Sequence, residues 1–119
     1  MRPLPIEYKS GVLVVRPSGA ALNEYQEIGL RQSLYETLAN MPNPRVALDL
    51  STIDFISSTG IAFLIGTKRR VESDQGQVVL FGVHPDVQKI LDSMKLTTLL
   101  DIAASETEAL GQLALPPAS

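Results

Sequence analysis

The chain opens with two short apolar runs that predict paired strands. Ile6–Tyr8 alternates apolar and polar positions, and Val12–Val15 is a continuous run rich in β-branched residues. Residues 9–11, which separate the two runs, include a glycine, and a connection this short favours a hairpin. We therefore expect the first two strands to be antiparallel neighbours.

From about Asn23 to Ala39 the apolar spacing changes to that of a helix. Leu30, Leu34 and Leu38 recur at the interval that places them on one helical face. Two prolines within residues 41–44 end this pattern, because proline cannot continue the hydrogen-bond ladder of a helix. The segment is predicted to be an amphipathic helix.

The rest of the chain alternates between strand-like and helix-like patterns. Gly76 is expected to end the second helix as a left-handed cap. This alternation predicts βαβ crossovers, and hence an α/β fold with a mixed, mainly parallel sheet of about four to five strands packed with about four helices. The predicted strands are Val46–Leu48, Val78–Val83 and a short Leu99–Ile102, and the predicted helices run from Gly60 to about Val71, from His84 to Met94 and from Glu106 to Leu113.

Length and composition indicate one globular domain. The chain has 119 residues, of which 45% are hydrophobic and 19% charged, which is ordinary for a folded domain and unlike a disordered segment. We expect a single domain over residues 1–119, with its core at about 6–113 and a short flexible tail at Pro116–Ser119.

Charge and cysteine content exclude several classes of function. Ten Lys and Arg against thirteen Asp and Glu give a net charge of −3, which argues against binding nucleic acid through bulk charge. The absence of cysteine excludes disulfides and cysteine zinc sites. The start of the chain has no apolar signal region, and the longest apolar stretch is far too short for a bilayer. We expect a soluble, cytoplasmic protein without membrane insertion.

The most distinctive segment carries three consecutive hydroxyl residues, Ser57, Ser58 and Thr59, followed by Gly60 and an apolar helix. A hydroxyl at this place accepts a hydrogen bond from one of the N–H groups that the first helical turn leaves unpaired. One of the three is therefore expected to be the N-cap. That structural role needs only one hydroxyl.

The segments LDLSTIDFISSTGIAFL and GQVVLFGVHPDVQKILDSMKL together resemble the STAS-domain anti-sigma factor antagonists of bacteria, and the similarity extends from about Val12 to Ile102. The resemblance implies a STAS fold. It also implies that Ser58 is the regulatory phosphoacceptor, with Thr59 and Ser57 as secondary candidates. Ser57 departs from the family pattern, because an acidic residue that could orient the kinase or its magnesium usually precedes the phosphoacceptor.

The function implied by this resemblance is partner switching. The unphosphorylated domain would bind an anti-sigma factor that is also a serine kinase, phosphorylation at Ser58 would release it, and a serine phosphatase would reset the cycle. Two alternatives stay open: a STAS accessory subunit of a lipid-transport ABC ATPase, and a scaffold subunit of a stress-sensing complex. Oligomeric state stays open as well.

A partner surface is expected beside the hydroxyl residues. If the apolar stripe of the helix faces the core, Phe63 and Thr67 point elsewhere, although packing of Phe63 under a neighbouring helix is an equal alternative. The basic run at residues 68–70 is interpreted as a solvated helix face, with contact to an acidic partner as the minor alternative. The predicted partner-binding residues are Ser57, Ser58, Thr59, Gly60, Phe63 and Thr67.

The sequence contains few of the motifs that are typical of enzymes. The nucleophile elbow of hydrolases and the glycine-rich phosphate and dinucleotide motifs are missing. His84, the single histidine, lies at a predicted helix start and is expected to cap it or to form a turn. Asp49 and Asp54 are expected to solvate or cap a strand exit. We therefore expect no catalytic residues, no metal site and no cofactor.

Overall fold

The structure is a computed structural model that describes residues 6–9, 11–17 and 19–114, apart from the side chains of residues 24–26. The predicted tail at Pro116–Ser119 and Ser10 of the predicted hairpin connection lie outside the described residues.

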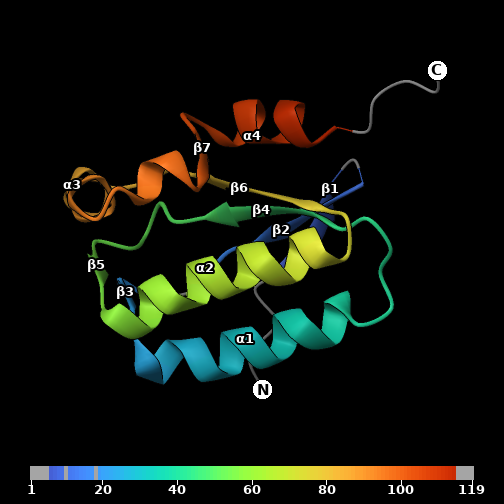
Figure 1. Ribbon diagram of the computed structural model, residues 1–119, viewed down its shortest axis with the longest axis horizontal. Helices are drawn as coiled ribbons and strands as arrows, with labels where there is room; N and C mark the ends of the chain where they lie inside the picture. Colours follow the sequence, from blue (N-terminus) through green and yellow to red (C-terminus); the bar gives the residue numbers. More distant parts are fainter. Residues whose placement is uncertain (1–5, 10, 18, 115–119) are drawn as a thin grey trace.

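A five-stranded sheet in the order β1-β2-β4-β6-β7 forms the centre of the fold (Figure 1). β1 pairs with β2 in the antiparallel direction, whereas the remaining neighbours are parallel. The predicted hairpin and the mixed, mainly parallel sheet are therefore confirmed. The strands are β1 (Ile6–Lys9), β2 (Val12–Val15), β4 (Arg45–Asp49), β6 (Gln77–Phe81) and β7 (Asp101–Ala103).

In the described part of the chain, four α-helices and one short 3-10 turn pack around the sheet. Figure 1 shows α1 and α2 side by side on one face and α4 alone on the other. The predicted α/β architecture is thus confirmed. The helices are α1 (Glu24–Leu38), α2 (Ser58–Ser73), α3 (Pro85–Ser93) and α4 (Glu106–Leu113), and the 3-10 turn is η1 (Leu96–Thr98).

Successive strand residues are divided between two cores. Leu13 and Val15 belong to the large core under α1 and α2, whereas Val12 and Val14 belong to the smaller core under α4. The central strands follow the same alternation, because successive side chains of a strand point to opposite faces. Both faces are covered, which explains why these strands are continuously apolar in the sequence.

Two sequence predictions at element ends are wrong in detail. The left-handed residue after α2 is Gln75, with φ of 64°, and not Gly76. Gly76 is required for a different reason: a Cβ there would lie 2.0 Å from the carbonyl oxygen of Pro44. The short last strand begins at Asp101, because Leu99 lies in the turn that follows η1.

Two further strands escaped the sequence pattern because each has only two residues. β3 (Ala21–Leu22) and β5 (Phe55–Ile56) form a separate parallel pair. β3 leads into α1, and β5 leads into α2. This small pair therefore joins the starting points of the two helices that cover the main face.

An ionic cluster fastens the start of α4 to the sheet. Arg16, just after β2, contacts Glu7 at 2.8 Å, Asp49 at 2.7 Å and Glu106 at 2.9 Å, and Lys9 contacts Glu106 at 2.6 Å. Hydrogen bonds from Arg16 and then from Lys9 lower the pKa of Glu106 to about 2. The carboxylate form of Glu106 is thus the form that holds α4 in place.

We expect the free energy of unfolding to fall as acid protonates Glu106. Its folded-state pKa lies below the ordinary value of 4.5, so its contribution is complete above about 4.5 and is lost as the pH falls towards about 2. Denaturant unfolding across this range should show a shallower pH dependence for Glu106→Gln than for the unmodified chain. Glu36→Gln, at an exposed position of α1, controls for net charge. Equal pH dependence in Glu106→Gln and the unmodified chain would contradict this role.

Candidate functional site

The β3–β5 pair fixes the chain immediately before the hydroxyl residues. The N–H groups of Asp54 and Phe55 donate to the carbonyl oxygen of Ala20 at 2.8 and 3.2 Å. The N–H of Ser57 then donates to the carbonyl oxygen of Leu22 at 3.0 Å. The backbone is therefore held by hydrogen bonds up to the last residue before α2.

Ser57 is the N-cap of α2. Its hydroxyl oxygen accepts a hydrogen bond from the N–H of Gly60 at 3.2 Å, and the hydroxyl donates to the carbonyl oxygen of Leu22 at 3.5 Å. The prediction that one of the three hydroxyls caps the helix is confirmed and assigned to Ser57. The cap makes no use of Ser58 or Thr59.

Gly60 is required by a close approach between α2 and β3. A Cβ at this position would lie 2.3 Å from the carbonyl oxygen of Leu22 and 2.7 Å from Cγ1 of Ile56. Gly60 itself is buried. The prediction that it forms part of a partner-binding surface is therefore wrong, because its place is under the site, where it sets the distance between helix and strand.

Ser58 is the residue of this segment that offers a free hydroxyl to solvent. It is the first residue of α2 and is exposed, and its side chain has no hydrogen-bond partner within the described part of the chain. Thr59 is half-buried, as is Ser57. The unpaired N–H groups of the first helical turn give the region around Ser58 a partial positive charge. A modifying enzyme would therefore find Ser58 more accessible than its two neighbours.

Phe55 is an exposed aromatic side chain that the sequence pattern did not single out. It lies on β5, is 54% exposed, and comes three residues before Ser58. Ile53 and Ile56 on either side of it are buried. In the sequence, Phe55 stands in a short and mostly apolar segment, residues 53–56. A segment of four residues does not reveal which of its apolar side chains faces solvent.

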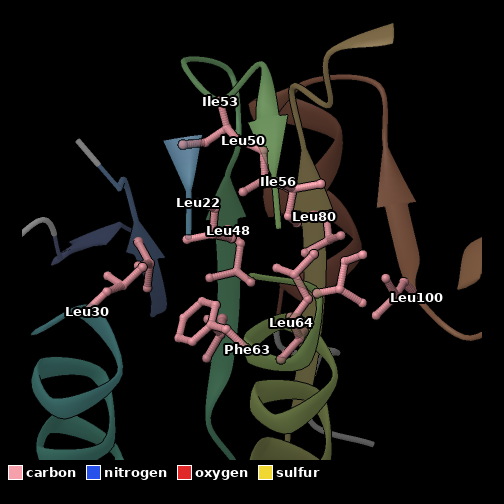
Figure 2. Packing of buried hydrophobic residues seen from close by; sticks show 14 of the residues in the cluster. Leu22, Leu30, Leu48, Leu50, Ile53, Ile56, Phe63, Leu64, Leu80 and Leu100 are labelled. Atoms are coloured by element: carbon pink, nitrogen blue, oxygen red, sulfur yellow. The ribbon is translucent and has the colours of Figure 1, made fainter. Parts of the chain in front are cut away.

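The prediction that Phe63 and Thr67 project towards a partner is wrong. Phe63 is 3% exposed and Thr67 is fully buried. The reason is that α1 packs along α2 and covers the helical face that the sequence pattern left open. Figure 2 shows Phe63 among the core side chains, near Leu48 and Leu64. The alternative that Phe63 packs under a neighbouring helix is the correct one.

The basic run after this face is largely satisfied by its own helix. Lys68 pairs with Glu72, and Arg70 pairs with Asp74 at 3.3 Å. The Arg70 guanidinium also lies 5.3 Å from the centre of the Tyr35 ring. These contacts support the interpretation of the run as a solvated helix face.

The acidic residue Asp49 and His84 have structural partners. The N–H of Asp86 donates to Nδ1 of His84 at 3.1 Å, which confirms His84 as the cap of α3. Partial burial alone raises the pKa of Asp49, but hydrogen bonds from Ser51 and Arg16 outweigh that effect and hold the pKa below its usual value.

Within residues 6–9, 11–17 and 19–114, no group of His, Asp and Glu side chains converges as a metal site. Across the same residues, none of the helices combines the length and the apolar character needed to cross a bilayer.

Comparison with known proteins gives consistent matches over most of the chain. The family model of the STAS domain matches residues 4–109. An anti-sigma F factor antagonist of Paenibacillus polymyxa is 26% identical over 110 residues, which cover 92% of this chain and 93% of that protein.

Two solved structures have the same fold at lower identity. An anti-sigma-factor antagonist (STAS) domain protein from Planctomyces limnophilus matches with a TM-score of 0.80 and 20% identity, over 92% of this chain and 95% of that chain. The anti-sigma factor antagonist SpoIIAA in its unphosphorylated form matches with a TM-score of 0.73 and 19% identity, over 90% and 92% of the two chains.

We expect Ser57→Ala to destabilise the domain by about 1 kcal/mol, because an N-cap hydroxyl typically contributes that much. Ser58→Ala is the matched control and should change the unfolding free energy by less than about 0.5 kcal/mol, because it removes an exposed, unpaired hydroxyl. Urea unfolding of the two variants and the unmodified chain measures both effects. A larger loss for Ser58→Ala would overturn the assignment of the cap.

We expect Gly60→Ala to destabilise the domain by about 2 kcal/mol or more, because the new methyl group overlaps the backbone of β3. Gly66→Ala in the same helix is the control, since its Cβ meets only the Tyr35 hydroxyl, at 3.5 Å. It should leave stability unchanged or raise it by up to about 1 kcal/mol through the helix propensity of alanine. Thermal unfolding of both variants tests the close approach. Similar melting temperatures would contradict it.

Proposed function

Because this chain belongs to the STAS domain family, we propose that it is an anti-sigma factor antagonist that switches partners through Ser58. The observation that carries this proposal is the hydroxyl of Ser58 at the start of α2, which is exposed and has no hydrogen-bond partner among the described residues. The neighbouring Ser57 already caps the helix. The Paenibacillus polymyxa relative is described as an anti-sigma F factor antagonist, which favours this function over a transporter subunit or a scaffold.

The proposed cycle uses the domain as a binding protein and not as an enzyme. Without phosphate it binds an anti-sigma factor that is also a serine kinase, and the sigma factor is set free. The kinase transfers a phosphoryl group to Ser58, and the modified domain leaves. A serine phosphatase restores the free hydroxyl. The description of SpoIIAA as unphosphorylated in its structure supports a cycle of this kind.

The physical effect of a phosphate at Ser58 falls on binding and not on folding. The phosphate carries a charge of about −1.5 to −2 at neutral pH. At a helix N-terminus such a charge is favourable by about 0.3–1 kcal/mol, so the domain stays folded. At an interface, by contrast, unfavourable charge contacts weaken binding by several kcal/mol. Because about 1.4 kcal/mol corresponds to a tenfold change in affinity, the effect on binding is the larger one.

The surface available to the partner differs from the one expected from sequence. Phe63, Thr67 and Gly60 are buried, whereas Phe55 and Asp54 are exposed just before Ser58. Aromatic side chains are enriched at protein interfaces. We therefore assign the partner contact to Asp54, Phe55 and Ser58, with the half-buried Thr59 at its margin.

Ser57 leaves this local structure intact although it replaces the acid usual in the family. Aspartate and serine are similarly good N-caps, so either residue would hold the first turn of α2. The departure therefore concerns only the charge offered to the kinase beside Ser58.

We expect Ser58→Ala to bind the anti-sigma factor as tightly as the unmodified chain, and Ser58→Asp to bind at least tenfold more weakly, because the carboxylate imitates part of the phosphate charge. Thr107→Asp is the matched control: it adds the same charge at an exposed position near the start of α4, on the other face of the sheet. Affinities are measured by calorimetry with the anti-sigma factor recovered by affinity capture from cell extract.

Equal affinities for Ser58→Ala and Ser58→Asp would rule out the switch. A comparable loss for Thr107→Asp would show that net charge is responsible and not the position of Ser58. Capture of an ABC ATPase that binds Ser58→Ala and Ser58→Asp with equal affinity would support the transporter-subunit alternative instead.

A further inference from the structure

One of the two edges of the central sheet is formed by β1. This strand pairs with β2 on one side, and among the described residues no strand pairs with its other side. An open edge exposes a row of backbone donors and acceptors to which another strand can be added. The question is which strand fits this edge.

The side chains of β1 are complementary to those of a second copy of the same strand. In the sequence Glu7, Tyr8, Lys9, opposite charges stand at equal distances on either side of the tyrosine. If two copies pair antiparallel about a two-fold axis at Tyr8, each Glu7 lies opposite the Lys9 of the other copy. Opposite charges in directly facing positions stabilise a strand pair. The other sheet edge, β7, offers no such match, because the same operation would set Asp101 against Ala103.

The charged side chains of β1 form ion pairs and are still accessible. Glu7 contacts Arg16 and Lys9 contacts Glu106, so both side chains lie on the α4 side of the sheet. Their side chains are nevertheless 49% and 44% exposed. A second copy would extend this cluster of alternating charges across the axis without reorganising it.

Tyr8 lies on the opposite face, where its hydroxyl contacts the sulfur of Met41 at 3.6 Å. It is 61% exposed, the largest value among the exposed large hydrophobic side chains of the described residues. A two-fold axis at Tyr8 sets the two rings against each other, and facing aromatic pairs stabilise strand pairs. Both faces of the strand therefore favour the same register.

We propose that two copies of this chain associate through their β1 edges, antiparallel and centred on Tyr8, to form one continuous sheet. The interface is isologous, so one strand supplies both halves of every contact. β1 and the start of α2 lie towards opposite ends of the molecule (Figure 1). Ser58 thus stays accessible in both copies, and the dimer does not depend on the function proposed above.

Association through so short a strand should be weak and dependent on concentration. The strand has four residues, whereas stable interfaces bury about 800 Å² on each partner. Sedimentation equilibrium of the unmodified chain should show a monomer at low concentration and a dimer as concentration rises. A monomer across the whole range would overturn the proposal, as would assembly that continues beyond the dimer.

Cysteine cross-linking tests the register, because the chain has no cysteine of its own. Facing residues of antiparallel strands have Cα atoms about 4.5–5.5 Å apart, which suits a disulfide. Tyr8→Cys should therefore form a disulfide-linked dimer at least tenfold faster than Ile28→Cys under mild oxidation. Ile28 is the control for random collision, because it is 59% exposed and lies on α1. Equal rates would overturn the proposal.

The two flanking positions give a second, independent test. Glu7→Cys and Lys9→Cys should each cross-link slowly alone, because identical positions are offset along the paired strands. A mixture of the two variants should cross-link at least tenfold faster, because residue 7 of one copy faces residue 9 of the other. Circular dichroism of each variant checks that it is folded. Rapid cross-linking of Glu7→Cys alone would contradict the register.

Discussion

The candidate site depends on the contacts that the carbonyl group of Leu22 makes with the start of α2. It accepts hydrogen bonds from the N–H of Ser57 and from the hydroxyl of the same residue. It also lies where a side chain at residue 60 would have to be, so that α2 reaches this distance only with Gly60. Two hydrogen bonds and one steric limit thus place the first turn of α2 against β3. As a consequence, Ser58 emerges at the surface.

In this arrangement the residue that caps the helix, Ser57, is a different residue from Ser58, whose hydroxyl is exposed. The Ser57 side chain forms hydrogen bonds with both Leu22 and Gly60, whereas the Ser58 side chain forms none with the described residues. A phosphate at Ser58 would therefore meet a preformed helix start and leave its cap undisturbed. Because the fold would not change, the added charge would act on the surface around the exposed Phe55, where we propose that a partner binds.

Much of the fold follows from the sequence because long apolar runs and helical spacing extend over many residues. The short β3 and β5 do not, since two residues carry no periodicity. The assignment of the functional site to Ser57–Thr59 stays a prediction, whereas the surface expected beside it differs from the structure. Phe63 and Thr67 are buried by α1, a contact between separate helices that the pattern of α2 alone cannot reveal. Gly76 was recognised as special, but the contact with Pro44 that requires it is distant in sequence.

The central claim is that phosphate on Ser58 and partner binding exclude each other. Its most direct test is phosphopeptide mapping by mass spectrometry of two pools of the chain taken from the same cells: the pool bound to its partner and the free pool. The account predicts an unmodified Ser58 in the bound pool and phosphate on Ser58 in the free pool. Equal phosphorylation of Ser58 in both pools, or phosphate confined to Ser57 or Thr59, would contradict it.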